Sequence, residues 1–141
     1  MSEEIRCINL GYVVPKDNSE EVEKIFKKHA SWMEGFYSEK NDGQTHLLNS
    51  YFTKVPEFVD PTDPSKGETG NIVFTINERF TSLESVQRHI ENAMKNDYFE
   101  EFGNILQNYG KVISPGGIIY HSIRWYIYCN QKEYDNFISK T

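Results

Sequence analysis

The sequence predicts an α+β domain in which helices cover one face of an antiparallel sheet. Short segments with alternating apolar residues indicate strands, and longer segments with apolar residues every three or four positions indicate helices. These segments follow the order strand, helix, strand, strand, helix pair, strand, which favours helices packed against one sheet. With 141 residues, the chain is long enough for a single domain over residues 1–141.

The first strand is predicted between Ile5 and Val14, because Ile8, Leu10 and Tyr12 share one face with Val14. Its other face is also largely apolar, so we expect the strand to be covered on both sides. A helix should follow, beginning at the capping-box pattern of residues 18–21. Its apolar stripe consists of Val22, Ile25, Phe26, His29, Met33 and Phe36.

Two more strands are predicted over residues 46–54 and 71–80. In the first, Leu47, Asn49 and Tyr51 alternate with apolar or small residues on the opposite face. Residues 56–70 between them are rich in Pro, Gly and acidic side chains, which predicts a long surface loop.

The next segment predicts a helix that opens at Thr81 and breaks near Asn96, where a second helix follows. Gly110 is expected to end this pair. A short strand, a turn or bulge at residues 115–117, a long strand over 118–129 and a short helix from Asn130 complete the prediction.

This order corresponds to a twice-repeated split β-α-β unit, the ferredoxin-like plan. Its helices lie on one face of the sheet, yet the first strand is apolar on both faces. Something must therefore cover the second face, and the simplest candidate is a second copy of the chain. We predict a homodimer that forms through the sheet face.

Composition limits the function classes. The net charge of −6 disfavours nucleic acid and anionic membrane surfaces as partners, because both require clustered positive charge. No apolar run is long enough to span a bilayer, and the first residues do not resemble a signal peptide. Cys7 and Cys129 form no disulfide framework, so we expect a reduced, cytoplasmic protein with Cys7 buried; a disulfide between them would need an oxidising compartment.

Three segments carry a family resemblance: Lys28–Met33, Glu78–His89 and Tyr98–Phe102. Together with the element order, they resemble the dimeric α+β barrel superfamily, which includes antibiotic-biosynthesis-monooxygenase-like and stress-responsive barrel proteins. The resemblance implies a dimeric barrel and, as one activity, cofactor-independent oxygenation of phenols or quinols.

Haem-degrading members of that superfamily use an Asn on the first strand, a Trp near the second helix and a His on that helix. Asn9 and His89 would match two of these positions, but no Trp lies between Phe74 and Phe102. The resemblance therefore does not imply haem, and we expect no cofactor.

Two histidines are the candidate catalytic residues. His29 lies on the apolar stripe of the first helix, where it would be either a pocket base or a core histidine bonded to a carbonyl or a Tyr. His89 would be either an acid or base in the pocket wall, as the resemblance implies, or a half-exposed residue near Glu84 or Glu91.

Four further residues are candidate ligand contacts: Asn9, Trp32, Asn49 and Tyr51. Asn9 lies in the middle of an apolar strand, where a buried amide needs a partner, either a ligand oxygen or a group across the dimer interface. Asn49 and Tyr51 share a face and would point into the same cavity, or make ordinary cross-strand pairs. The four His show no metal-ligand spacing, so no metal site is predicted.

We expect an aromatic-rich pocket between the helices and the sheet, which favours a small apolar or aromatic ligand. Three hypotheses follow: a cofactor-independent oxygenase-like enzyme, a binding protein without chemistry, and a dimeric structural or interaction module with a filled interior. The fold class does not distinguish them.

Overall fold

The computed structural model describes residues 4–123 and confirms an α+β fold. The strands are β1 (Arg6–Pro15), β2 (Leu47–Phe58), β3 (Glu68–Phe80) and β4 (Gly110–Ile118). The α-helices are α1 (Lys16–Phe36), α2 (Leu83–Ala93) and α3 (Phe99–Tyr109). Short 3₁₀ turns lie at Glu39–Asn41, Gly43–Thr45 and Pro64–Lys66.

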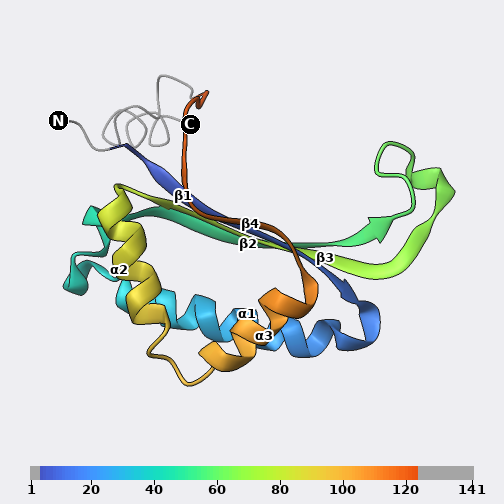
Figure 1. The fold of residues 1–141 in the computed structure, drawn as a ribbon, viewed down its shortest axis with the longest axis horizontal. Coiled ribbons are helices and arrows are strands. Elements are labelled where there is room, and N and C mark those ends of the chain that lie inside the picture. The colour runs from blue at the N-terminus through green and yellow to red at the C-terminus, as the bar shows by residue number, and fades with distance from the viewer. Residues whose placement is uncertain (1–3, 124–141) are drawn as a thin grey trace, which may run out of the picture.

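The four strands form one sheet with the order β2-β3-β1-β4, and every neighbouring pair is antiparallel. All three helices lie on the same side of this sheet (Figure 1). The arrangement is compatible with the ferredoxin-like plan, and the predicted helix break near Asn96 separates α2 from α3.

The two sides of the sheet differ in burial. Ile8, Leu10, Tyr12 and Val14 of β1 are buried under the helices, and we call this side the helix face. The residues between them, such as Asn9, are half-buried and lie on the opposite side, the outer face. The alternation predicted for β1 is therefore the one that the structure has.

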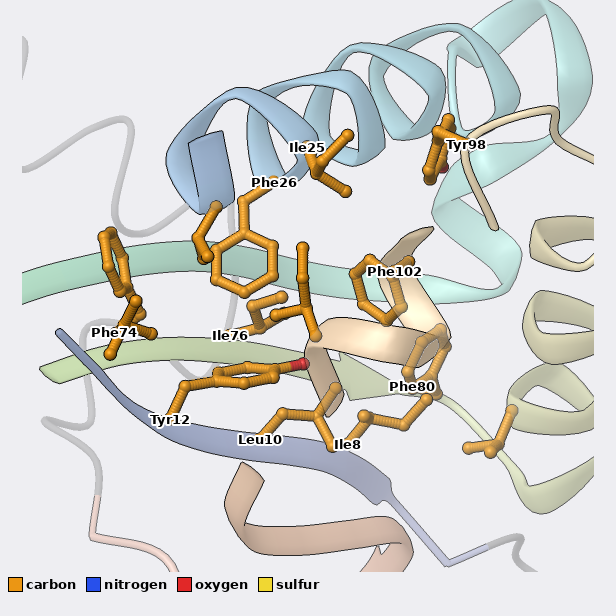
Figure 2. Packing of buried hydrophobic residues seen from close by; sticks show 14 residues of the cluster. Ile8, Leu10, Tyr12, Ile25, Phe26, Phe74, Ile76, Phe80, Tyr98 and Phe102 are labelled. Atoms are coloured by element: carbon orange, nitrogen blue, oxygen red, sulfur yellow. The ribbon is translucent and has the colours of Figure 1, made fainter. Parts of the chain in front are cut away.

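Aromatic side chains fill the core between the helices and the helix face. Figure 2 shows Tyr12 of β1 lying beneath Phe26 of α1, with Phe102 of α3 beside them. The Phe26 ring meets Phe74 edge-on at 5.6 Å between centroids and meets Phe102 at 5.9 Å. Such edge contacts add about 0.5–1.5 kcal/mol each to the burial of the rings.

The surface loop predicted over residues 56–70 is confined to residues 59–67, because both of its ends belong to strands. β2 continues to Phe58 and β3 begins at Glu68, and the two strands extend past the helices as an arm (Figure 1). Pro56 interrupts few ladder bonds because β2 is an edge strand of the sheet.

Other boundaries also differ from the predictions. α1 begins at Lys16, directly after Pro15, and not at the capping-box pattern of residues 18–21. α2 is capped by Ser82, whose hydroxyl accepts a hydrogen bond from the backbone N–H of Ser85. Cys7 is half-buried, whereas the sequence predicted that it would be buried.

β4 is one strand with the predicted bulge inside it. Cys7 pairs with Gly117 and Ile8 with Pro115, so Gly116 is the extra residue. Its φ of 99° is a conformation that only glycine adopts readily. Residues 119–123 are not in a strand, and the rest of the predicted 118–129 strand, Cys129 and the helix from Asn130 lie outside the described residues.

Candidate functional site

His29 faces the core from α1, as its spacing from Ile25 and Phe26 predicted. Its exposed fraction is 3%, and its Nδ1 lies 2.8 Å from the hydroxyl oxygen of Tyr98. The tyrosine partner is the one that the core-histidine interpretation proposed. That interpretation is incomplete, however, because the second ring nitrogen faces a carboxylate.

His89 is on α2, one turn after Val86, and it is buried to the same degree, with an exposed fraction of 3%. The half-exposed alternative is therefore wrong. Its Nδ1 lies 2.7 Å from the hydroxyl oxygen of Tyr37, a residue that follows α1 directly. Burial lowers the pKa of His89 to about 4, and the nearby Glu78 carboxylate only partly offsets this effect. His89 is therefore neutral at pH 7.

Glu78 is the acidic group between these histidines. It lies on the helix face of β3 with an exposed fraction of 2%. Its Oε2 is 3.6 Å from His29 Nε2 and 3.5 Å from His89 Nε2, and no group within residues 4–123 donates a hydrogen bond to this oxygen. The two histidines thus approach one carboxylate oxygen from different helices.

Glu78 was not among the predicted site residues, although its position in the sequence indicated an unusual buried carboxylate. In the strand predicted over residues 71–80, alternation places Ile72, Phe74, Ile76 and Phe80 on one face, and Glu78 occupies the remaining position of that face. A carboxylate in an otherwise apolar row indicates either a paired buried charge or a functional group. Tyr37 and Tyr98 had no comparable signal, since each reaches its histidine from a distant segment.

Both tyrosine hydroxyls remain protonated at neutral pH. Burial, followed by the charge of Glu78, raises the pKa of Tyr37 and of Tyr98 well above the ordinary value. Each hydroxyl can donate to Nδ1 of its histidine or accept from it, depending on the imidazole tautomer. We call Tyr98, His29, Glu78, His89 and Tyr37 the His-Glu-His cluster.

A cavity of about 220 Å³ adjoins the His-Glu-His cluster. Its walls come from the sheet and from α2 and α3, and its only polar lining side chains among the described residues are His29, Glu78 and His89. Its apolar lining includes Leu10, Ile90, Phe99, Phe102, Ile113 and Pro115. The cavity therefore combines apolar walls with one charged and hydrogen-bonding side.

A hollow of about 280 Å³ between α1, β2 and β3 has different chemistry. Its charged lining residues are Glu23, Lys27 and Lys54, and two of them, Glu23 and Lys54, are paired with each other, with 2.7 Å between Oε1 and Nζ. Because the one carboxylate of this hollow is already paired, the hollow offers less to a ligand hydroxyl than the cavity beside the cluster.

The remaining predicted site residues separate into two groups. Trp32 lies next to the cluster, with its ring stacked on His29 at 5.5 Å between centroids and 5.4 Å from the His89 ring. Asn9, Asn49 and Tyr51 lie on the outer face, so they do not line the helix-side cavity. The Asn9 amide donates to Asn77 Oδ1 at 3.0 Å and thus has a protein partner.

The chain matches no protein-family model, no curated protein and no solved structure. Within residues 4–123, no helix is both long and apolar enough to cross a membrane. The geometry of the cavity and its cluster is accordingly the basis on which a function is assigned.

Proposed function

We propose that the protein binds a small apolar or aromatic molecule that carries one hydroxyl group, in the cavity beside the His-Glu-His cluster. The observation that carries the proposal is the Glu78 carboxylate oxygen, which is buried at the cavity and accepts no hydrogen bond. A buried carboxylate without a donor is costly, and a ligand hydroxyl would remove that cost.

The cavity walls support the apolar part of this ligand. Phe99 and Phe102 offer aromatic surface, and Leu10, Ile90 and Ile113 offer aliphatic surface. Pockets of this composition take their affinity from apolar contact and their specificity from a few polar groups. A cavity of about 220 Å³ also favours a ligand-binding role over a structural module with a filled interior.

A thermodynamic comparison tests the proposal. We expect 2-naphthol to bind at least about tenfold more tightly than naphthalene, since a hydrogen bond to a charged group contributes about 1.5–3 kcal/mol. His29→Phe should reduce this difference, and His46→Gln should not, because His46 contacts Ser85 and does not line the cavity. Calorimetric titrations that give equal affinities for the two probes, or no binding of either, would contradict the proposal.

Proton removal from a phenol or quinol, as the first step of cofactor-independent oxygenation by dioxygen, is a second candidate. His29 is the favoured acceptor, because its ring lies between the Tyr98 hydroxyl and the Glu78 carboxylate, which would stabilise an imidazolium. His89 is a weaker base, since its pKa is about 4. Oxygen-electrode measurements with hydroquinone should show uptake above autoxidation that His29→Phe removes; uptake equal to autoxidation would leave only the binding role.

We also propose that two copies pair through their outer faces as a dimeric α+β barrel. What supports this is the apolar surface there, since Tyr51, Val55 and Val112 are each about half exposed on that face. Sedimentation at micromolar concentration should show a dimer, and Tyr51→Lys should weaken it. The matched variant Val59→Lys, in the connection after β2, should leave it intact; a monomeric parent protein would contradict the pairing.

A further inference from the structure

His29, Glu78 and His89 come from α1, β3 and α2, and the fold brings one donor atom of each to within 4.8 Å of the other two. All three side chains are buried. The sequence separation of the three residues explains why no metal-ligand spacing was visible in the chain. Two imidazoles and one carboxylate are a ligand set that divalent zinc and iron commonly use.

The second observation is the state of Glu78. Its side chain has an exposed fraction of 1%, and its Oε2 has no hydrogen-bond donor in the part of the chain that the structure describes. Buried charges in proteins are paired or bind metal ions, because an isolated carboxylate is strongly destabilised away from water. The approaches to the histidine nitrogens, 3.5 and 3.6 Å, are too long for hydrogen bonds but close to the separations of ligand atoms that share an ion.

The third observation is the role of the tyrosines. Each histidine uses Nδ1 toward a tyrosine hydroxyl and directs Nε2 toward Glu78. Histidine ligands in metal sites usually have their second ring nitrogen hydrogen-bonded, which fixes the ring and its tautomer. Here both outer contacts are present, and both ring nitrogens needed for an ion point to the same carboxylate oxygen.

We propose that the His-Glu-His cluster is a binding site for a divalent first-row transition metal ion, with His29 Nε2, His89 Nε2 and Glu78 Oε2 as ligands. Three protein ligands leave at least one coordination position open. Because His29, Glu78 and His89 all line the adjoining cavity, the open position would accept an oxygen of a molecule bound there.

Ion binding requires at most a small contraction of the cluster. Donor atoms about 2.1 Å from a shared ion lie no more than about 4.2 Å apart. The 4.8 Å bound on the three donors is slightly wider. Side-chain torsions of Glu78 and the two histidines supply this movement, and the tyrosine contacts limit it.

Zn²⁺ alone, titrated calorimetrically into the tag-free, chelator-treated full chain, tests the site. We expect one ion per chain, an affinity reduced at least about tenfold by Glu78→Gln, and a smaller loss in Tyr98→Phe, which removes an outer contact of His29. His46→Gln is the matched control, because it removes a histidine outside the cluster. No binding, or equal binding by the parent protein and Glu78→Gln, would overturn the proposal.

A measurement on the unaltered protein covers the case in which Glu78→Gln fails to fold. The imidazole ¹⁵N resonances of His29 and His89 should both move on adding one equivalent of Zn²⁺, with Nε2 metal-bound and Nδ1 protonated. Unchanged resonances of these two rings would overturn the proposal. The inference goes beyond ligand binding and uses no organic molecule, so it can fail while 2-naphthol still binds, and the reverse also holds.

Discussion

Two neighbouring residues of β3, Asn77 and Glu78, show that polar side chains have different hydrogen-bond partners on the two faces of the sheet. Asn77, on the outer face, accepts from Asn9 and donates to Thr75, so its amide is satisfied by short cross-strand and local contacts. Glu78, one residue later and on the helix face, has an exposed fraction of 2% and a carboxylate oxygen without a donor. These polar groups of the outer face thus satisfy one another, whereas the helix face holds a carboxylate oxygen that accepts no hydrogen bond from any described residue.

The contrast also extends to the apolar residues. Phe26, Tyr12 and Phe102 bury aromatic surface under the helices. Tyr51 and Val55 leave about half of theirs exposed on the outer face. Stability should therefore depend mainly on the helix face, and the cluster should lower that stability while providing a site.

The largest expected effect is at the core of the helix face. Phe26→Ala removes a ring that contacts Tyr12, Phe74 and Phe102, and it should lower the free energy of unfolding by about 3–5 kcal/mol. Val59→Ala, at a residue with an exposed fraction of 61%, should stay within about 0.5 kcal/mol of the parent protein. Urea unfolding monitored by circular dichroism measures both, and similar losses for the two variants would contradict the difference between core and surface.

The next effect has the opposite sign. Glu78→Leu replaces a buried carboxylate, to whose Oε2 no described residue donates a hydrogen bond, with an apolar side chain of similar size. It should raise the free energy of unfolding by about 1–3 kcal/mol. The same variant should lose its preference for 2-naphthol over naphthalene. Chelator-treated protein is the appropriate sample for the urea titration, because a bound ion would stabilise only the parent protein. A loss of stability in this variant would mean that Glu78 serves the fold as a structural ion pair with His29 or His89.

The smallest effect is expected on the outer face. Asn9→Ala removes the hydrogen bond that the half-buried Asn9 amide donates to Asn77. It should lower the free energy of unfolding by about 0.5–1.5 kcal/mol. Binding of 2-naphthol should not change, because Asn9 does not line the cavity. An affinity loss as large as that of His29→Phe would place the ligand on the outer face.

Periodicity was sufficient to predict the sequence of elements, the buried face of β1 and the inward direction of His29. It also predicted correctly that Asn49 and Tyr51 share a face, but it placed Leu47 on that same face, and the reason for this error is local. The pairing of β2 with β3 shifts register between Leu47 and Asn49, which changes the parity of every later residue. Leu47 and Phe52 therefore pack against the core, although simple alternation had placed them on opposite faces.

The cluster itself was only half predictable. The spacing of His29 on a helical stripe indicated burial, whereas the burial of His89 was left open. Their common partner lies on a strand far from both in sequence. Only the tertiary arrangement of α1, α2 and β3 brings the three groups together. Likewise, the continuation of β2 and β3 into an arm depends on Pro56 lying in an edge strand, a position that local composition does not reveal.

The most direct test of the central claim, that the helix face holds the ligand site, is a two-dimensional NMR titration of the labelled protein with 2-naphthol. We expect saturable shifts at residues that line the cavity, including His29, His89 and Ile113. Shifts confined to the outer face, at Asn9, Asn49 and Tyr51, would contradict it.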